Sequence, residues 1–385
     1  MISRIALIAA VAMLGACSAE TPDAPEADMA DAGAPVTIAA TLADVEVVHG
    51  STPDDYVLSW VSEPAGAPVS VRVSTDPLSD YGLLIAEGVT DGSFNWAAEG
   101  SLERRYFTIQ PAGGAAVTSA VRLLPLEGGR NFRDLGGYPA ADGRTVKWGH
   151  AFRSGVMAEL TDADYDYLSD LGIKTVCDFR DADERRNEPT DWRAGAIDYV
   201  TFADPEGSED PADNPMFASL LDPDSTPDDV ANAMAAGYAD IAKGEDEGYT
   251  AMFDRLAKGE IPLAFNCSAG KDRAGTAAAL LLTVLGVPRD IIVHDYSLSD
   301  DYVDYMEAFL NDEARAEAEA GDNPYAFLME LPPEKVAPLM ASHPMYIEAS
   351  FASMEDEHGS VLDFIKVELD VTDEEVDAIR SALLH

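Results

Sequence analysis

Residues 262–275 read PLAFNCSAGKDRAG, and this stretch decides the fold of the larger part of the chain. An apolar run is followed by a short loop that contains a glycine, and an Ala- and Leu-rich segment begins directly after it. This order predicts a buried strand, a tight loop and a helix. A loop of this kind can aim successive backbone N–H groups at one anion, and the helix adds the positive end of its dipole. The sequence therefore predicts an anion-binding loop at the end of a strand.

Two side chains of this loop have the chemistry for phosphate transfer. Cys267 stands at the base of the loop, and Arg273 follows it after five intervening residues. A helix N-terminus and nearby cations lower the pKa of a thiol, so we expect Cys267 to be a thiolate. Arg273 is a planar donor that can hold two oxygens of the same anion. This pair fits in-line attack on a phosphate monoester without a metal ion, and a structural cysteine in the core is the alternative role of Cys267.

The loop resembles that of the atypical bacterial protein tyrosine phosphatases, which reads His-Cys-x-x-Gly-Lys-Asp-Arg-Thr-Gly. Further stretches from about residue 128 onwards resemble the same family in the same order: NFRDLGG (131–137), FRS (152–154), LGIKTV (171–176), DFR (178–180) and DYSLS (295–299). The family includes secreted dual-specificity and phosphoinositide phosphatases. For residues 127–385 the resemblance implies the α/β fold of the cysteine-dependent phosphatases, with a mainly parallel central sheet and a helical cap.

The resemblance also implies roles for the residues of the loop. Cys267 would be the nucleophile that takes the phosphoryl group, and Arg273 would bind the phosphate and its transition state. Asp272 is the implied general acid, and its alternative role is a structural pairing with a cation of the same loop. The residues implied to bind the substrate phosphate are Ser268, Ala269, Gly270 and Lys271.

Four further residues are expected to support the loop. Asp178 ends a predicted strand, where the active sites of α/β proteins gather, and it is the second candidate for the general acid. Arg133 and Arg180 are expected to brace the loop rather than to contact the substrate. Asn266 directly precedes the nucleophile and is expected to donate to the carbonyl groups that organise the loop.

Two residues depart from the family's pattern. Asn266 replaces a His and therefore brings no positive charge to the thiolate, and Ala274 replaces a Thr or Ser whose hydroxyl stabilises the departing thiolate. We therefore expect a slow second step, in which phosphocysteine accumulates. The alternative hypothesis is a pseudo-phosphatase, a lipoprotein that binds phosphorylated ligands without turnover. The two replacements favour that alternative, and the intact Cys267, Asp272 and Arg273 oppose it.

Cys177 lies in a predicted apolar strand. Its expected role is that of a core cysteine. The alternative is a reversible disulfide with Cys267 that shields the nucleophile, because both residues are predicted to lie near strand ends that could converge.

The N-terminus indicates export. Residues 1–16 hold one early cation, an apolar run and small residues, which is typical of a secretory signal and too short to span a membrane. Cys17 and the three residues before it resemble a bacterial lipobox, so we expect a lipid on Cys17, with a plain cleaved signal as the alternative. Residues 17–37 are rich in Ala, Pro and acids and are expected to be a flexible tether. We expect a lipoprotein on the periplasmic face of a membrane, and Ser18 favours the outer membrane.

Residues 38–125 alternate between apolar and polar positions, as in VSVRV (69–73), with turn signals between the runs. This pattern predicts a small all-β sandwich. Trp60 on an early strand and Tyr106 on a late one resemble the fibronectin type III pattern. Such a module is expected to act as a spacer or a docking unit.

Strands and helices alternate from residue 127 onwards, which favours a mainly parallel sheet. The predicted strands are 173–179, 197–202 and 262–265, and the predicted helices are 161–171, 228–257 and 274–285. Residues 204–229 contain nine acids and no Lys or Arg and are expected to form a loop or lid. Residues 311–345 are expected to form an accessory helical cap.

The 385-residue chain has 71 Asp and Glu against 25 Lys and Arg, which gives a formal net charge of -46. Affinity for duplex DNA comes largely from cations that neutralise phosphates, so the composition argues against a nucleic-acid partner. The six His residues have no ligand spacing, and we expect no metal site and no cofactor. The expected partner is a phosphorylated protein, with phosphotyrosine as the default and phosphoserine as an alternative, or else a phosphoinositide or small phosphate ester. The sequence does not indicate an oligomeric state.

Overall fold

The computed structural model describes residues 39–79, 82–100, 102–202, 215–311 and 326–385. The predicted signal, the predicted lipidation site Cys17 and the predicted tether lie outside the described residues. The same is true of residues 203–214, which contain the first part of the predicted acidic loop.

Seven antiparallel strands form two sheets in the N-terminal part of the described chain, with the orders β1-β2-β5 and β4-β3-β6-β7. The strands are β1 (Thr41–His49), β2 (Asp55–Glu63), β3 (Val69–Ser74), β4 (Leu83–Val89), β5 (Ser93–Ala97), β6 (Tyr106–Pro111) and β7 (Val117–Ser119). Alternate residues of β2 and β3, such as Leu58 and Val71, are buried, and side chains of both sheets form one hydrophobic cluster. The alternating pattern therefore reflects two sheets packed face to face.

A five-stranded sheet organises the rest of the described chain, with the order β11-β10-β12-β9-β8. Its strands are β8 (Arg133–Asp134), β9 (Ala151–Ser154), β10 (Thr175–Asp178), β11 (Asp198–Thr201) and β12 (Leu263–Asn266). β8 is antiparallel to β9, and the other pairs are parallel. Cys177 and Phe265 belong to one hydrophobic cluster, whereas Val176 and Ala264 belong to another. The central strands are thus buried on both faces, as parallel strands require.

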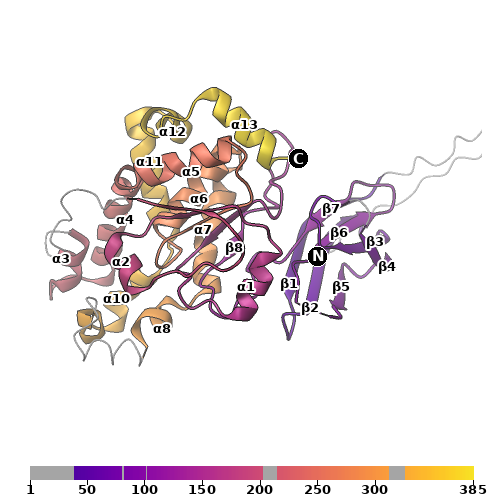
Figure 1. Cartoon of the computed structure of the whole chain (residues 1–385), viewed down its shortest axis with the longest axis horizontal. Coiled ribbons are helices and arrows are strands. Elements are labelled where there is room, and N and C mark those ends of the chain that lie inside the picture. The colour runs from indigo at the N-terminus through magenta and orange to yellow at the C-terminus, as the bar shows by residue number, and fades with distance from the viewer. Residues whose placement is uncertain (1–38, 80–81, 101, 203–214, 312–325) are drawn as a thin grey trace, which may run out of the picture. The chain divides into compact units, whose positions relative to one another are not determined.

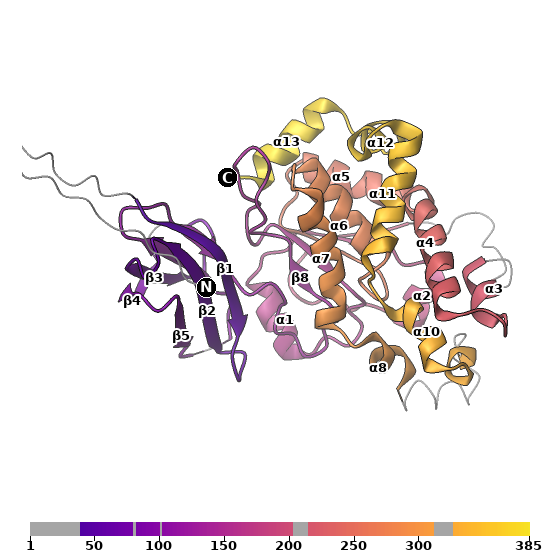
Figure 2. The ribbon, with the colours of Figure 1, turned by 180° about the vertical axis from the view of Figure 1, so that it is seen from behind.

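Helices cover both faces of this sheet (Figure 1, Figure 2). Their bounds are α1 (Asp162–Ser169), α2 (Ala182–Asn187), α3 (Pro215–Leu221), α4 (Pro227–Gly244), α5 (Asp246–Ala257), α6 (Arg273–Val284), α7 (Arg289–Tyr302), α8 (Tyr305–Leu310), η2 (Ala326–Glu330), α10 (Pro333–Met340), α11 (Pro344–His358), α12 (Val361–Glu368) and α13 (Asp373–Leu383). α1 packs on the face of Val176, and α5, α6, α11, α12 and α13 join the cluster on the opposite face. Among the described residues, no helix has the length and apolar character needed to cross a membrane.

Two predicted segments differ from the structure. The helix predicted over 228–257 is interrupted at Glu245, whose φ of −112° and ψ of 17° separate α4 from α5. The acidic stretch predicted as a loop over 204–229 is helical in part of its described portion. There α3 occupies 215–221, and α4 begins at Pro227 after the capping residue Thr226. Acidic residues in a first helical turn are favourable, so a run of acids did not exclude a helix start.

Candidate active site

The loop that follows β12 lies at the carboxyl end of the central sheet. β12 ends at Asn266 and α6 begins at Arg273, which is the predicted order of strand, loop and helix. β9 and β10 flank β12 in parallel, so their carboxyl ends reach the same edge. Cys267 is buried at the base of the loop, and its Sγ accepts a hydrogen bond from the Gly270 N–H at 3.3 Å.

Gly270 allows the loop to turn against a neighbouring segment. Its φ is +74°, a conformation that other residues rarely adopt. A Cβ at this position would lie 2.4 Å from the backbone nitrogen of Gly155. Because both the conformation and the space exclude a side chain, only glycine fits here.

Three successive carbonyl groups of the loop point outward. They accept hydrogen bonds from donors outside the loop: Ser268 from the Val156 N–H at 3.0 Å, Ala269 from the Tyr305 hydroxyl at 3.0 Å, and Gly270 from Arg153 and Asn131 at 2.9 and 3.0 Å. Because these carbonyl groups are turned away and held, the N–H groups of the loop are left to face its interior. The loop therefore has the arrangement of a nest that binds an anion.

A buried ion network fixes Arg153. Its Nη1 lies 2.9 Å from Asp295 Oδ2, and Arg133 Nη2 lies 3.6 Å from the same oxygen. Tyr138 donates to the other oxygen of Asp295 at 2.8 Å. Burial raises the pKa of Asp295, but the two guanidinium groups outweigh it and hold the pKa at about 2. Arg133 thus supports the loop indirectly, because it helps to hold the carboxylate that holds Arg153.

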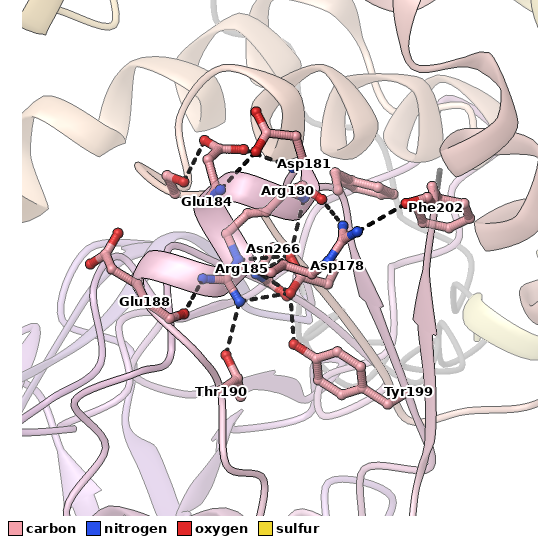
Figure 3. Close-up of polar contacts among 12 residues, drawn as sticks. Asp178, Arg180, Asp181, Glu184, Arg185, Glu188, Thr190, Tyr199, Phe202 and Asn266 are labelled. Carbon is pink, nitrogen blue, oxygen red and sulfur yellow. Dashed lines mark hydrogen bonds and ion pairs between the residues drawn. The ribbon is translucent and has the colours of Figure 1, made fainter. Parts of the chain in front are cut away.

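Asp178 is the centre of a second buried network (Figure 3). Its carboxylate accepts from Arg180 at 2.7 and 2.9 Å, from the Tyr199 hydroxyl at 2.7 Å and from Asn266 Nδ2 at 2.9 Å. Arg180 also donates to the Glu188 carbonyl at 2.6 Å. Asp178 therefore connects β10, β11 and β12. Asn266, at the place of the family's His, has a structural partner in this network rather than in the loop.

Arg273 is held by a carboxylate that the sequence did not single out. The Glu184 carboxylate on α2 accepts hydrogen bonds from Nη1 and Nη2 of Arg273 at 2.7 and 2.6 Å. The Ser268 hydroxyl donates to the same carboxylate at 2.6 Å. Burial raises the pKa of Glu184, but Arg273 and Ser268 outweigh it and lower the pKa to about 2. Glu184 is therefore ionised, and it makes with Arg273 and Ser268 the contacts that a phosphate oxygen pair would make.

The pKa of Cys267 is raised, which is opposite to the expected direction. Burial is the main cause, and the nearby Asp272 and Glu184 add to it, whereas Arg273 and the Ala274 N–H lower the pKa. Arg273 does lower the pKa, but its ion pair with Glu184 brings a negative charge to the site as well, and the arginine does not outweigh burial. The thiol is thus the favoured form of Cys267 in this arrangement.

Lys271 and Asp272 are paired with each other. Lys271 Nζ lies 2.8 Å from Asp272 Oδ1 and also donates to the Ala341 carbonyl at 3.3 Å. The Tyr238 hydroxyl donates to the same Asp272 oxygen, and Tyr296 donates to Tyr238 at 2.6 Å. The pairing that a structural role of Asp272 requires is therefore present.

Cys177 is a core residue of β10. It is free and fully buried, and burial raises the pKa of its thiol to about 12. Its partner across the sheet is Phe265, and Cys267 follows directly after the last residue of the adjacent strand, Asn266. If the chain kept strand geometry up to Cys267, the Cα atoms of the two cysteines would be about 8 Å apart. Disulfides span about 4.4–6.8 Å, so a bond between them would require backbone movement.

Several residues that build the site were missed in the sequence: Asn131, Arg153, Glu184, Tyr238 and Asp295. Asn131, Arg153 and Asp295 stand in stretches that resemble the phosphatase family, which was the available signal for them. Glu184 gave only the signal of a helix cap, since it also forms the capping box of α2 with Asp181. In the described ranges of the chain, no group of three or more His, Cys, Asp or Glu side chains could hold a metal ion.

The chain is similar to known phosphatases over most of its length. The sequence profile of the tyrosine phosphatase family matches residues 124–385. A Cupriavidus necator protein provisionally named a tyrosine-protein phosphatase is 32% identical over 279 residues, which cover 72% of this chain and 94% of that protein. A tyrosine-protein phosphatase of Nostoc commune is 33% identical over 177 residues, or 45% of this chain and 56% of that protein. A triple specificity protein phosphatase of Mycobacterium tuberculosis is 28% identical over 285 residues, which cover 69% of this chain and 99% of that protein.

Replacement of Asp295 by Asn should destabilise the protein, because it leaves the buried guanidinium groups of Arg133 and Arg153 without their counter-ion. We expect the free energy of unfolding to fall by about 3 kcal/mol, as for other broken buried ion pairs. The matched control is Asp301→Asn, an exposed position of the same helix, which should change it by less than about 0.5 kcal/mol. Denaturant unfolding measures both.

The contribution of Asp295 to the free energy of unfolding should decrease at low pH. The folded-state pKa of Asp295 lies below its ordinary value of 3.8, so the ionised form stabilises the fold above that value. The stabilisation is lost as the pH falls towards about 2. The difference between the parent and Asp295→Asn should therefore shrink in this range, and a constant difference would contradict the assignment.

Proposed function

This chain belongs to the tyrosine phosphatase family, and from that premise we propose that it releases phosphate through a phosphocysteine intermediate on Cys267. As a member of the family it is a phosphoric monoester hydrolase. The observation that carries the proposal is that the carbonyl groups of residues 268–270 point away from the loop interior and accept hydrogen bonds from outside it. Cys267 lies at the base of this loop, and Arg273 directly follows it. This arrangement supplies a nucleophile below and donors around a phosphoryl group.

The reaction divides into two steps. The Cys267 thiolate attacks phosphorus, the Sγ–P bond forms, and the bond to the leaving oxygen breaks as that oxygen takes a proton. Arg273 and the N–H groups of the loop hold the remaining oxygens, whose charge develops in the transition state. Water then attacks phosphorus, and the thiolate departs. The family resemblance implies Asp272 as the proton donor.

Binding of a phosphate dianion competes with Glu184 for Arg273 and Ser268. Displacement of Glu184 would free the charge of Arg273 for the substrate and for the thiolate. We propose protein phosphotyrosine as the substrate, with dual specificity as an extension. The names of the relatives support this class, since all three are called tyrosine-protein or triple specificity phosphatases.

A pseudo-phosphatase that binds phosphorylated ligands without turnover is the second candidate. The raised pKa of Cys267 favours it, as do Asn266 and Ala274 at the places of the family's His and hydroxyl residue. The pseudo-phosphatase hypothesis predicts that the protein binds phosphate but forms no phosphocysteine.

Acid quenching during hydrolysis of a ³²P-labelled phosphotyrosine peptide should trap label on the parent protein. Cys267→Ser should trap none and lose steady-state activity, because serine is a much poorer nucleophile at neutral pH. Cys177→Ser is the matched control, and it should still be labelled because Cys177 lies in the core. Phosphate binding by a parent that traps no label would establish the pseudo-phosphatase instead.

Replacement of Ala274 by Thr should speed the second step. The added hydroxyl can donate to the departing thiolate, and a hydrogen bond to a charged group corresponds to about a 10-fold faster release of phosphate. Rapid-quench kinetics should show a burst in the parent and a smaller burst in the variant. Ala274→Val adds similar volume without a donor and should keep the parent's burst. Equal single-turnover and steady-state rates in the parent would contradict a slow second step.

We also propose that the enzyme is an exported lipoprotein, with residues 1–16 as the signal, a lipid on Cys17, residues 17–37 as a tether and 38–125 as a fibronectin III-like spacer. The strand orders β1-β2-β5 and β4-β3-β6-β7 support a sandwich of that kind. Full-length protein produced in a bacterium with labelled palmitate should carry label in the membrane fraction. Cys17→Ser should lose the label and leave the membrane fraction, while Cys177→Ser should keep the label and stay in the membrane fraction. An unlabelled parent in the soluble periplasmic fraction would support a plain cleaved signal.

A further inference from the structure

Two tyrosine hydroxyls form a buried relay that ends on Asp272 of the loop after β12. Tyr296 on α7 donates to the Tyr238 hydroxyl at 2.6 Å, and the Tyr238 hydroxyl on α4 donates to Asp272 Oδ1. Only 2% of Tyr238 and 1% of Tyr296 are exposed to solvent. Burial raises the pKa of both phenols, and the charge of Asp272 adds to it, so both hydroxyls keep the protons that they donate.

Packing holds both rings in the interior. Four buried residues stand four positions apart on one face of α4: Val230, Met234, Tyr238 and Ala242. Tyr346 packs against the Tyr238 ring, with 5.5 Å between the ring centroids. Gly275 lets α6 approach the Tyr296 ring, since a Cβ there would lie 3.0 Å from it. The relay is therefore fixed by its rings as well as by its hydroxyls.

Asp272 does not cap the helix that it precedes. It stands at the N-cap of α6, where an Asp side chain usually accepts from a backbone N–H of the first turn, but it makes no such hydrogen bond. Its Oδ1 instead accepts from Tyr238 and from Lys271 Nζ, which lies at 2.8 Å. The first N–H groups of α6 are therefore not taken by this carboxylate.

The second oxygen of Asp272 is left for chemistry. Within the described ranges, no hydrogen bond or ion pair reaches Oδ2, and 28% of the side chain is exposed. An oxygen that already accepts from two donors is a poor site for a proton, so the acid form carries its proton on Oδ2. The charge of Asp272 also reaches the nucleophile, since it is one of the causes that raise the pKa of the Cys267 thiol. Pairing at Oδ1 and proton donation from Oδ2 are therefore compatible.

Tyr238 is the firmer of the two partners of Oδ1. Lys271 reaches this oxygen through a long side chain, and the family resemblance implies that the same side chain binds the substrate phosphate. A phosphate at the loop would therefore compete with Asp272 for Lys271. Tyr238 is buried and uncharged, so a phosphate does not draw it away from Asp272.

We propose that Tyr238 is a positioning residue: it fixes Asp272 through Oδ1 and so directs the proton on Oδ2 to the leaving oxygen, while Tyr296 orients the Tyr238 hydroxyl. As the Sγ–P bond of Cys267 forms and the P–O bond breaks, the proton on Asp272 Oδ2 passes to the departing oxygen. In the second step Oδ2 takes a proton from the attacking water, and the Sγ–P bond breaks to return the thiolate. This inference rests on the proposed phosphocysteine reaction with Asp272 as its proton donor.

Two leaving groups separate positioning of the acid from a general loss of structure. Single-turnover formation of phosphocysteine is measured with phenyl phosphate, whose leaving group needs a proton, and with 2,4-dinitrophenyl phosphate, whose leaving group does not. Tyr238→Phe should lose about 10-fold with phenyl phosphate, which corresponds to one hydrogen bond to a charged group. With dinitrophenyl phosphate it should lose less than about 3-fold, because no proton is required. Its affinity for inorganic phosphate should stay close to that of the parent.

Tyr346→Phe is the matched control. It removes a buried hydroxyl beside Tyr238 that donates to the Pro338 carbonyl at 2.9 Å instead of joining the relay. This variant should react like the parent with both substrates. Tyr296→Phe keeps the hydrogen bond from Tyr238 to Asp272 and removes only the donor behind it. It should show the pattern of Tyr238→Phe with a smaller loss.

A double-mutant cycle shows whether Tyr238 acts through Asp272. Asp272→Asn should lose about 100-fold with phenyl phosphate and less than about 3-fold with dinitrophenyl phosphate, as expected of a general acid. Addition of Tyr238→Phe to Asp272→Asn should cause no further loss that depends on the leaving group, because the proton that Tyr238 positions is already gone.

Equal losses of Tyr238→Phe on the two substrates would overturn the inference, since a structural defect does not depend on the leaving group. Additive losses in the double variant would also overturn it. If Tyr238→Phe does not fold, Tyr296→Phe decides between the same two outcomes. An Asp272→Asn variant without a leaving-group-dependent loss would overturn the inference and leave the phosphocysteine reaction intact. A parent that forms no phosphocysteine even from dinitrophenyl phosphate would overturn the proposed function, and this inference with it.

Discussion

The hydrogen bond from Arg153 to the Gly270 carbonyl holds the loop in the orientation that its chemistry requires. If that carbonyl faced inward, its oxygen would repel a phosphate from the position above Cys267. Arg153 can hold it only because Asp295 fixes the guanidinium in the interior of the protein. A buried charge without a partner is costly, so the ion network and the loop are maintained together. The anion site is therefore a consequence of a structural ion pair behind it.

The cations of the loop each have an acidic partner, which gives the site its electrostatic character. Arg273 is paired with Glu184, and Lys271 is paired with Asp272. In a chain with a net charge of -46, free cations at the site would be the exception. A phosphate that bound to these cations would therefore have to displace a carboxylate rather than fill an empty positive pocket. Burial raises the pKa of the Cys267 thiol, and the nearby Asp272 and Glu184 add to this, so the lowering by Arg273 does not outweigh it.

The local order of strand, loop and helix around Cys267 could be predicted, because it depends on neighbouring residues and on backbone geometry. The break at Glu245 could not be predicted in the same way. Gly244 and Gly248 lower the helix propensity on either side of Glu245, but glycine alone does not fix a break. The contact of Tyr249 with Arg273 and the close approach of Gly248 to Phe179 involve distant parts of the chain. Asp178 was predicted at the correct edge of the sheet but with an unresolved role, since its partners depend on strand pairing.

The sequence by itself determined the strand, loop and helix around Cys267 and Arg273, the α/β class and the acidic balance, because these depend on residue type and short spacing. Only the tertiary structure decided which carboxylate meets which cation. Asp295, Glu184 and Glu245 come from three separate segments, and the local sequence of each does not show which arginine it will lie beside. Packing brings each of them to a buried arginine or leaves it without a partner, and burial then sets its protonation state.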